Sequence, residues 1–183
     1  MSDSNAYQES CRFLVAREDS GDLYAIHERI KAIIGNQPIS YAPAGLDREG
    51  RMVVVLRSSP QSPLPDSKWM YMENGMAFKV NAGVRFVKRS DFGERMPTVG
   101  EALEKWTTVL SAGGFDARDT RLVESAIAFY HRRLNNHVRL PFWALSSTLT
   151  VVDAEKAAGT MIRGVGRSRG LGFGMLMRVP EEA

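Results

Sequence analysis

A tyrosine and a histidine three residues apart form the first pair of side chains that could do chemistry. Tyr24 and His27 lie in the stretch DLYAIHERIKAIIG (residues 22–35), whose apolar residues recur with helical spacing. Residues three apart share one face of a helix, so we expect the phenol and the imidazole to lie side by side. Histidine is the side chain most often used as a general acid or base near neutral pH. A single helical histidine is also commonly a surface or core residue, and the spacing leaves that alternative open.

A glycine-rich segment late in the sequence is the second candidate. The segment GVGRSRGLGFGMLM (residues 164–177) places Arg167 and Arg169 among its glycines. It does not match the dinucleotide fingerprint, which would need glycine at position 169, and it lacks the G-K-[ST] of a P-loop. Glycines let backbone amides approach an oxyanion closely, and the planar guanidinium of arginine can hold neighbouring phosphates. A tight turn from a helix into a strand would explain the glycines equally well.

Positive charge is concentrated around this segment. The whole chain carries a net charge of only +3, but residues 129–178 hold eight cations against Asp153 and Glu155. A solvated surface is the usual explanation of a charged cluster, whereas a glycine loop inside one favours an anionic ligand. His131 and His137 flank a predicted turn in the same stretch, where contact with RNA and the absence of any function are equally plausible. The cations are Arg132, Arg133, Arg139, Lys156, Arg163, Arg167, Arg169 and Arg178.

Composition excludes several classes of protein. With 44% hydrophobic and 25% charged residues the chain is expected to fold, and no apolar run approaches the length that spans a bilayer. The polar start MSDSNAYQES does not resemble a secretory signal, so we expect a cytoplasmic protein. One cysteine and three histidines give no zinc ligand set, and no carboxylates have metal-ligand spacing. We therefore expect neither a metal nor a small-molecule cofactor.

The elements that must position these residues follow a repeated order. In the first half we expect a strand at 11–17, a helix at 22–35, strands at 38–42 and 51–57, and a loop at 58–68. The second half begins with extended structure at 68–89, which we expect to be broken at Asn74-Gly75 and Gly83. A helix at 99–114 follows, and the next stretch, 118–134, could be a helix or a strand. We then expect a strand at 138–152, a helix at 154–164 and a last strand at 172–179.

This order predicts an α+β protein with tandem ferredoxin-like (β-α-β-β-α-β) domains and antiparallel sheets. We expect the domains at 1–80, which carries the tyrosine and histidine, and at 81–183, which carries the basic stretch and the glycine loop. The loop at 58–68 stands where the first domain would need its second helix.

Three stretches resemble a known family. DLYAIHERI (22–30) is similar to its pattern of a tyrosine three residues before a histidine on the first helix. The tail STLTVVDAEKAAGTMIRGVGRSRGLGFGMLM (147–177) is similar to its signature G-x-G-x-[SA]-[RK]-x-x-G-x-G-[LM], and RMPTVGEALEKWTTVLSAGGF (95–115) resembles its link into the second domain. The family is the CRISPR repeat-RNA endoribonucleases of the CasE type, the precursor-processing subunit of the Cascade surveillance complex.

The resemblance implies a metal-independent RNA cleavage beside a repeat stem-loop. In this family the ribose 2′-OH attacks the adjacent phosphate, giving a 2′,3′-cyclic phosphate and a 5′-hydroxyl. By the same resemblance His27 transfers a proton, and Tyr24 positions the 2′-OH or the scissile phosphate. The expected partners are repeat RNA and other Cascade subunits. The expected RNA-binding residues are Gly164, Gly166, Arg167, Ser168, Arg169 and Gly170 of the loop, with Arg132, Arg133, Arg139 and Arg163.

One motif departs from the family, and two other functions stay open. Where relatives often carry F-R-L-R-A-N-P, this chain has FKVNAGV (78–84) and so loses an arginine and the proline. A non-catalytic RNA-binding or scaffolding subunit could use the same basic surface. A ferredoxin-like domain that binds a small molecule would show no salt-dependent RNA binding.

Overall fold

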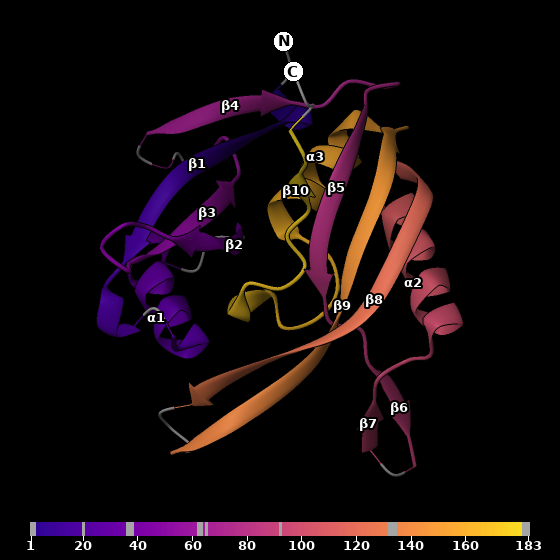
Figure 1. Ribbon diagram of the computed structural model, residues 1–183. Coiled ribbons are helices and arrows are strands. Elements are labelled where there is room, and N and C mark those ends of the chain that lie inside the picture. The colour runs from indigo at the N-terminus through magenta and orange to yellow at the C-terminus, as the bar shows by residue number, and fades with distance from the viewer. Residues whose placement is uncertain are drawn as a thin grey trace.

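The chain folds into two four-stranded antiparallel sheets, seen to the left and right of Figure 1. The computed structural model describes residues 3–19, 21–35, 39–61, 64, 66–91, 93–131 and 135–180. The first sheet and its helix comprise β1 (Ala6–Val15), α1 (Leu23–Ile34), β2 (Ile39–Leu46), β3 (Met52–Ser58) and β4 (Ser67–Tyr71). The second comprises β5 (Ala77–Val84), α2 (Val99–Ala112), β8 (Phe115–His131), β9 (Asn136–Val151), α3 (Ala154–Arg163) and β10 (Met177–Arg178). A separate hairpin is formed by β6 (Lys88–Ser90) and β7 (Gly93–Arg95).

The strand order confirms the predicted tandem ferredoxin-like fold. The first sheet has the order β2-β3-β1-β4 and the second has the order β10-β5-β9-β8, which is the same arrangement of first, second, third and fourth strands. Each sheet is antiparallel throughout. We refer below to residues 3–71 as the first unit and to residues 77–180 as the second unit.

The helix α1 forms as its sequence predicts. The side chain of Asp22 caps the helix by accepting hydrogen bonds from the backbone amides of Tyr24 and Ala25, at 2.9 and 3.3 Å. The apolar stripe of the helix, which includes Ile26 and Ile30, is buried against the first sheet. The polar stripe therefore faces outward, and it is there that Tyr24 lies half-buried.

A loop replaces the missing second helix of the first unit. Leu64 is only 7% exposed and joins the core that α1 forms with the sheet. The amide side chain of Gln8, itself buried, accepts hydrogen bonds from the backbone amide of Leu64 at 3.1 Å and from the Ser67 hydroxyl at 2.9 Å. In the described part of this loop, Leu64 thus covers the sheet where a helix would have done so, and the buried oxygen of Gln8 is hydrogen-bonded.

The second unit has both helices. A capping box between Thr98 and Glu101 begins α2, and Trp106 and Leu110 on its inner stripe are fully buried. The ambiguous stretch 118–134 is a strand as far as His131, paired with β9 apart from an irregularity between Arg118 and Arg121. Residues 132–134 lie outside the described part of the chain.

Several boundaries differ from the sequence prediction. The first strand begins at Ala6, because pairing with both β3 and β4 extends it. Gly83 does not break β5. A Cβ at this position would lie 3.3 Å from the ring of Phe142, so the glycine makes room for an aromatic side chain. The predicted boundary between residues 80 and 81 falls inside β5, and the change from one sheet to the other comes between Tyr71 and Ala77.

The last predicted strand is also shorter than expected. Of residues 172–179 only Met177–Arg178 pairs with β5. Gly172 and Gly174 have φ values of +84° and +82°, which turn the chain out of the extended conformation before the strand can begin.

Helix α3 of the second unit lies between the two sheets (Figure 1). Its Met161 carbonyl accepts a hydrogen bond from the Ser40 hydroxyl at 2.9 Å, within a fully buried contact. Arg57 of β3, 1% exposed, donates to the carbonyl of Leu176 at 2.6 Å and to the carboxylate of Glu9 at 2.6 Å. These buried polar contacts fix the orientation of one unit against the other. Within the described residues, no helix is long and apolar enough to cross a bilayer.

Candidate active site at the junction of the two units

Tyr24 and His27 lie together on the outer side of α1. Their ring centroids are 6.3 Å apart with the rings inclined by 58°, and both side chains are half-buried. Neither imidazole nitrogen of His27 has a hydrogen-bond partner among the residues that the structure describes, and neither is a buried unsatisfied atom. The imidazole is therefore accessible to a substrate.

The two ends of the glycine loop, residues 164–174, are bonded to each other, and one of them is bonded to β5. The amide of Val165 donates to the carbonyl of Gly174 at 2.8 Å, and the amide of Gly174 donates to the carbonyl of Gly83 at 2.7 Å. A Cβ on Gly164 would lie 2.8 Å from the Gly174 carbonyl oxygen, and one on Gly174 would overlap the carbonyl of Val165. Gly164 and Gly174 are thus required for close packing of the backbone.

The middle of the loop presents backbone donors. Ser168 adopts a left-handed conformation with φ +57° and begins a single turn of 3-10 helix, Arg169–Leu171. The backbone amides of Ser168, Arg169 and Gly170 donate to no other group in the described part of the chain. Consecutive free amides at such a turn form a concave site suited to an anion.

This turn lies directly against His27. A Cβ built on Gly170 would be 3.1 Å from Cε1 of the imidazole, so any side chain here would crowd the ring. The Tyr41 hydroxyl donates to the Gly170 carbonyl at 2.6 Å, which ties the loop to β2 of the first unit. Burial raises the pKa of the Tyr41 phenol well above its usual range, so the group remains a donor. The fold therefore joins the two candidates that the sequence separates by more than a hundred residues.

The two arginines of the loop have different partners. Arg167 forms an ion pair with Glu94 of β7, and its amide donates to the Arg85 carbonyl at 2.9 Å. Arg169 is exposed, and its guanidinium donates to the carbonyl of Arg163 at 3.2 Å. Arg169 therefore keeps most of its donors available, whereas Arg167 would have to exchange a carboxylate for a phosphate.

Glu94 is held in place by the hairpin that carries it. Arg95 and Lys88 of this hairpin both pair with Glu101 at the start of α2, and they hold the pKa of that carboxyl well below its usual range. The guanidinium of Arg85 donates to the Ser168 hydroxyl at 3.1 Å and adds a cation to the loop. Sequence reasoning missed Arg85 because nothing in its segment indicates contact with the loop.

The remaining predicted RNA-binding residues are more scattered. The guanidinium of Arg163 folds back over α3, where a Cβ on Gly159 would lie 3.0 Å from it. Arg139 is exposed on β9, and its neighbours Val138 and Leu140 pack toward α1, so Arg139 points to the opposite side of the hairpin. A Cβ on Gly166 would lie 2.7 Å from the Val84 side chain, which gives this glycine a packing role. Arg132 and Arg133 lie outside the described residues.

A second histidine lies beside Tyr24. The long β8–β9 hairpin carries Phe129 onto the core beneath α1, and the ring of His131 comes to a centroid distance of 5.0 Å from that of Tyr24, inclined by 30°. From the sequence, His131 is as plausibly a residue that contacts RNA as one without any function. Only the length and register of the hairpin place it at the site.

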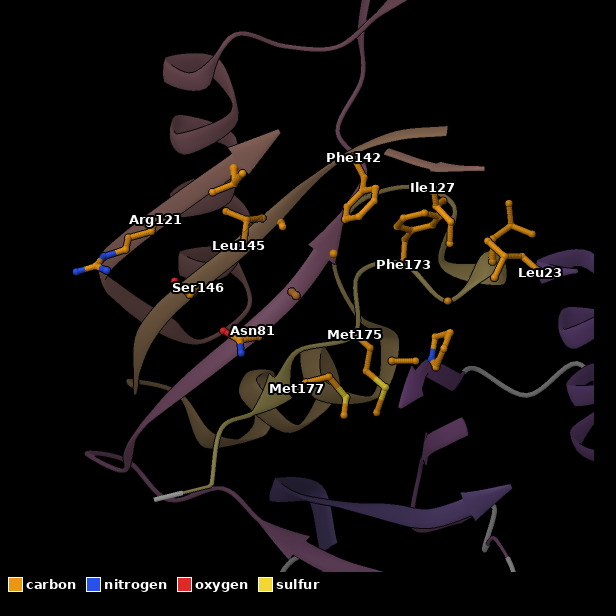
Figure 2. A pocket seen from close by; sticks show the side chains of 18 residues that line it. Leu23, Asn81, Arg121, Ile127, Phe142, Leu145, Ser146, Phe173, Met175 and Met177 are labelled. Atoms are coloured by element: carbon orange, nitrogen blue, oxygen red, sulfur yellow. The ribbon is translucent and has the colours of Figure 1, made fainter. Parts of the chain in front are cut away.

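An apolar groove of about 550 Å³ opens next to the loop, lined by the second sheet and by residues of α1 and β2 of the first unit. Figure 2 shows Phe142 of β9 and Phe173 of the loop at one end, near Ile127 and Leu23, and Asn81, Ser146 and Arg121 toward the other. The two phenylalanine rings are 5.3 Å apart. The loop thus contacts His27 through Gly170 and lines this groove through the next three residues.

Possible metal ligands do not cluster near these groups. Within the described ranges, no three side chains of His, Cys, Asp or Glu come close enough to hold one ion.

Comparison with known families decides what kind of protein this is. The family model described as CRISPR associated protein matches residues 79–180, which is more than half of the chain. The chain belongs to this family of CRISPR-associated proteins. The match covers the second unit from β5 through the glycine loop, and it confirms the family that the tail motif indicates.

Solved CRISPR proteins share the fold of this CRISPR-associated chain over nearly its whole length. Thermus thermophilus Cse3, bound to an RNA representing a pre-cleavage complex, is 18% identical, with a TM-score of 0.66 over 96% of this chain and 98% of that one. Escherichia coli Cas6e is 16% identical, with a TM-score of 0.69 over 96% and 100%. A chain of a CRISPR RNA-guided surveillance complex in a pre-nicking state is 11% identical, with a TM-score of 0.60 over 94% and 98%. No curated protein sequence matches significantly.

Proposed function

We propose that this protein is an endoribonuclease that cleaves the stem-loops of CRISPR repeats in precursor RNA and then stays in the effector complex. The observation that carries the proposal is the contact between the glycine loop and His27, because it brings free backbone amides and an accessible imidazole to one place. The fold shared with Cse3 and Cas6e supports the same conclusion. In this proposal the first unit supplies the reacting side chains and the second unit supplies most of the RNA-binding surface.

The amides of residues 168–170 would hold the scissile phosphate or its neighbour. A phosphate seated there lies beside the His27 ring, since Gly170 is in contact with it. The ribose 2′-OH then attacks the phosphorus. The bond from O2′ to phosphorus forms, the bond from phosphorus to O5′ breaks, and the products end in a 2′,3′-cyclic phosphate and a 5′-hydroxyl.

His27 is the group that transfers the proton in this reaction. Its ring nitrogens have no partner in the described part of the chain, so one of them can take the 2′-OH proton or give a proton to O5′. Tyr24, half-buried beside it, positions the 2′-OH or the phosphate. This chemistry needs no metal ion, and we propose that cleavage is metal-independent.

Cations on the second unit bind the RNA backbone. Arg169 offers donors directly, and Arg167 can exchange Glu94 for a phosphate at the same turn. We propose that Arg132, Arg133, Arg139 and Arg163 extend this surface, and that the RNA contacts of Gly164 and Gly166 are secondary to their packing. Phosphate contacts of this kind make affinity fall steeply with salt concentration.

Retention in a larger complex is supported by the likeness to a chain of a surveillance complex. We infer that the repeat stem-loop stays on the basic surface after cleavage and that other Cascade subunits bind this protein together with the RNA.

Substitution of His27 tests the proposal. With a stem-loop transcribed from the repeat of the CRISPR array nearest the gene, we expect His27→Ala to lower the single-turnover cleavage rate by about 100- to 10,000-fold. RNA affinity is expected to change little, because the amides and arginines remain. His137→Ala is the matched control, since His137 is exposed and its ring lies against that of Tyr130 of its own hairpin. Cleavage by His27→Ala at the wild-type rate would overturn the assignment.

A chelator separates the enzyme from the alternatives. We expect the wild type to cut the stem-loop in excess EDTA and to leave a 2′,3′-cyclic phosphate, detected by mass spectrometry of the product. A stable, salt-sensitive and uncut complex would instead indicate a non-catalytic RNA-binding subunit. Loss of cleavage in EDTA with recovery on adding Mg²⁺ would contradict the metal-independent mechanism.

A further inference from the structure

His131 has an environment that a surface histidine would not have. Its ring lies at a centroid distance of 5.0 Å from that of Tyr24 of α1 and at 6.3 Å from that of Phe129 of its own strand. Tyr24 in turn lies 6.3 Å from His27. The phenol therefore lies near two imidazoles, one from each unit.

The two nitrogens of the His131 ring differ. Nδ1 is buried and has no hydrogen-bond partner within the described residues. Nε2 also has no partner there, and it is not among the buried unsatisfied atoms, so it reaches solvent. An N–H on the buried nitrogen would lack any acceptor, which is costly, and the neutral ring therefore carries its proton on Nε2. The accessible nitrogen is then a fixed hydrogen-bond donor.

Cleavage through a 2′-OH needs such a donor. As O2′ bonds to phosphorus, negative charge grows on the non-bridging phosphate oxygens, and a preorganised donor aimed at them stabilises the transition state more than the ground state. His27 is already engaged in proton transfer, and the turn that carries the free amides of the glycine loop lies against it. The imidazole of His131, whose ring lies 5.0 Å from that of Tyr24, is a further donor close to these groups.

We propose that His131 is a third functional side chain of the site and that its Nε2–H donates a hydrogen bond to the scissile phosphate. The inference rests on the proposed function and adds to it a residue from the second unit. The ring contact with Tyr24 orients the imidazole for this purpose, and the buried Nδ1 keeps it in the donating tautomer. His131 takes no proton from the substrate in this scheme.

Two substitutions separate a donor from a packing residue. His131→Phe keeps an aromatic ring against Tyr24 but has no donor, and we expect its single-turnover rate to fall about 100-fold. His131→Gln loses the ring but places an amide NH₂ near the position of Nε2, and we expect it to recover the rate to within about tenfold of the wild type. The RNA is the repeat stem-loop used above, and KD is measured beside the rate. Equal rates for His131→Phe and the wild type, or a glutamine variant slower than the phenylalanine variant, would show that His131 only packs.

Imidazole NMR signals test the contact independently of turnover. We expect the Nε2 and Hε1 signals of His131 to shift on adding the stem-loop with 2′-deoxyribose at the cleavage position. If the wild type leaves the RNA uncut, the proposed function fails, and the uncut stem-loop itself serves as the probe. Signals of His27 that shift while those of His131 do not would overturn this inference alone.

Discussion

The two units of the molecule have the same strand order but complete their cores in different ways. The second unit covers its sheet with α2 and α3, whose inner faces are fully buried. Among its described residues, the first unit has α1 and a loop on one side of its sheet, and the other side is covered by α3 of its neighbour. The first unit is therefore structurally incomplete without the second, even though it carries Tyr24 and His27.

This difference explains where the candidate site forms. A loop that must close the second unit also packs on α1 and β2 of the first, with Gly170 against His27 and bonded to Tyr41. The contacts that stabilise the pair of units are thus the same contacts that bring the reacting groups together. Some substitutions should change the stability of one unit, and others should change the site at the junction. Measuring both effects tests whether the two units differ in this way.

The largest effect is expected at Gly174, inside the second unit. An alanine there would combine a strained backbone at φ +82° with overlap on the Val165 carbonyl, so we expect Gly174→Ala to lower the free energy of unfolding by more than about 4 kcal/mol. Thermal unfolding followed by circular dichroism measures it. Gly100→Ala is the control in the same unit, because a Cβ there meets nothing within 4 Å. A folded, stable Gly174→Ala protein would contradict the packing role assigned to this glycine.

A smaller effect is expected from Leu64, the residue that stands in for a helix in the first unit. We expect Leu64→Ala to cost about 2 to 3 kcal/mol, because it removes buried apolar atoms from a core with few of them to lose. Urea unfolding of this variant is compared with that of Leu46→Ala, whose side chain is 61% exposed and is expected to change stability by no more than about 0.5 kcal/mol. If the two variants unfold alike, the loop does not replace the helix energetically.

The smallest effect on stability is expected at the junction itself. Tyr41→Phe removes one hydrogen bond to Gly170, for a loss of about 1 kcal/mol. Because the same bond holds the loop against His27, we expect the single-turnover cleavage rate to fall severalfold with little change in RNA affinity. The control Tyr71→Phe alters an exposed phenol of the same unit. A higher KD with an unchanged single-turnover rate at saturating protein would show that Tyr41 acts on RNA binding alone.

Local sequence pattern was sufficient for most of the fold. The apolar stripe and the Asp22 cap specify α1, and the box of Thr98 and Glu101 specifies the start of α2, because these signals act within a few residues. The stretch 118–134 stayed ambiguous, since alternation along a strand and a helical stripe are compatible with the same apolar positions. Pairing with β9 decided it.

By itself the sequence determined the order of elements, the Tyr24 and His27 pair on one helix face, the glycine loop and the excess of cations around it. Each depends on residues that are neighbours in the chain. Only the tertiary structure decided that Gly170 meets His27, that Arg167 is paired with Glu94, and that His131 lies on Tyr24. These contacts join residues about 70 to 140 positions apart, and they depend on how α3 packs between two sheets and how far β8 extends, which no local pattern encodes.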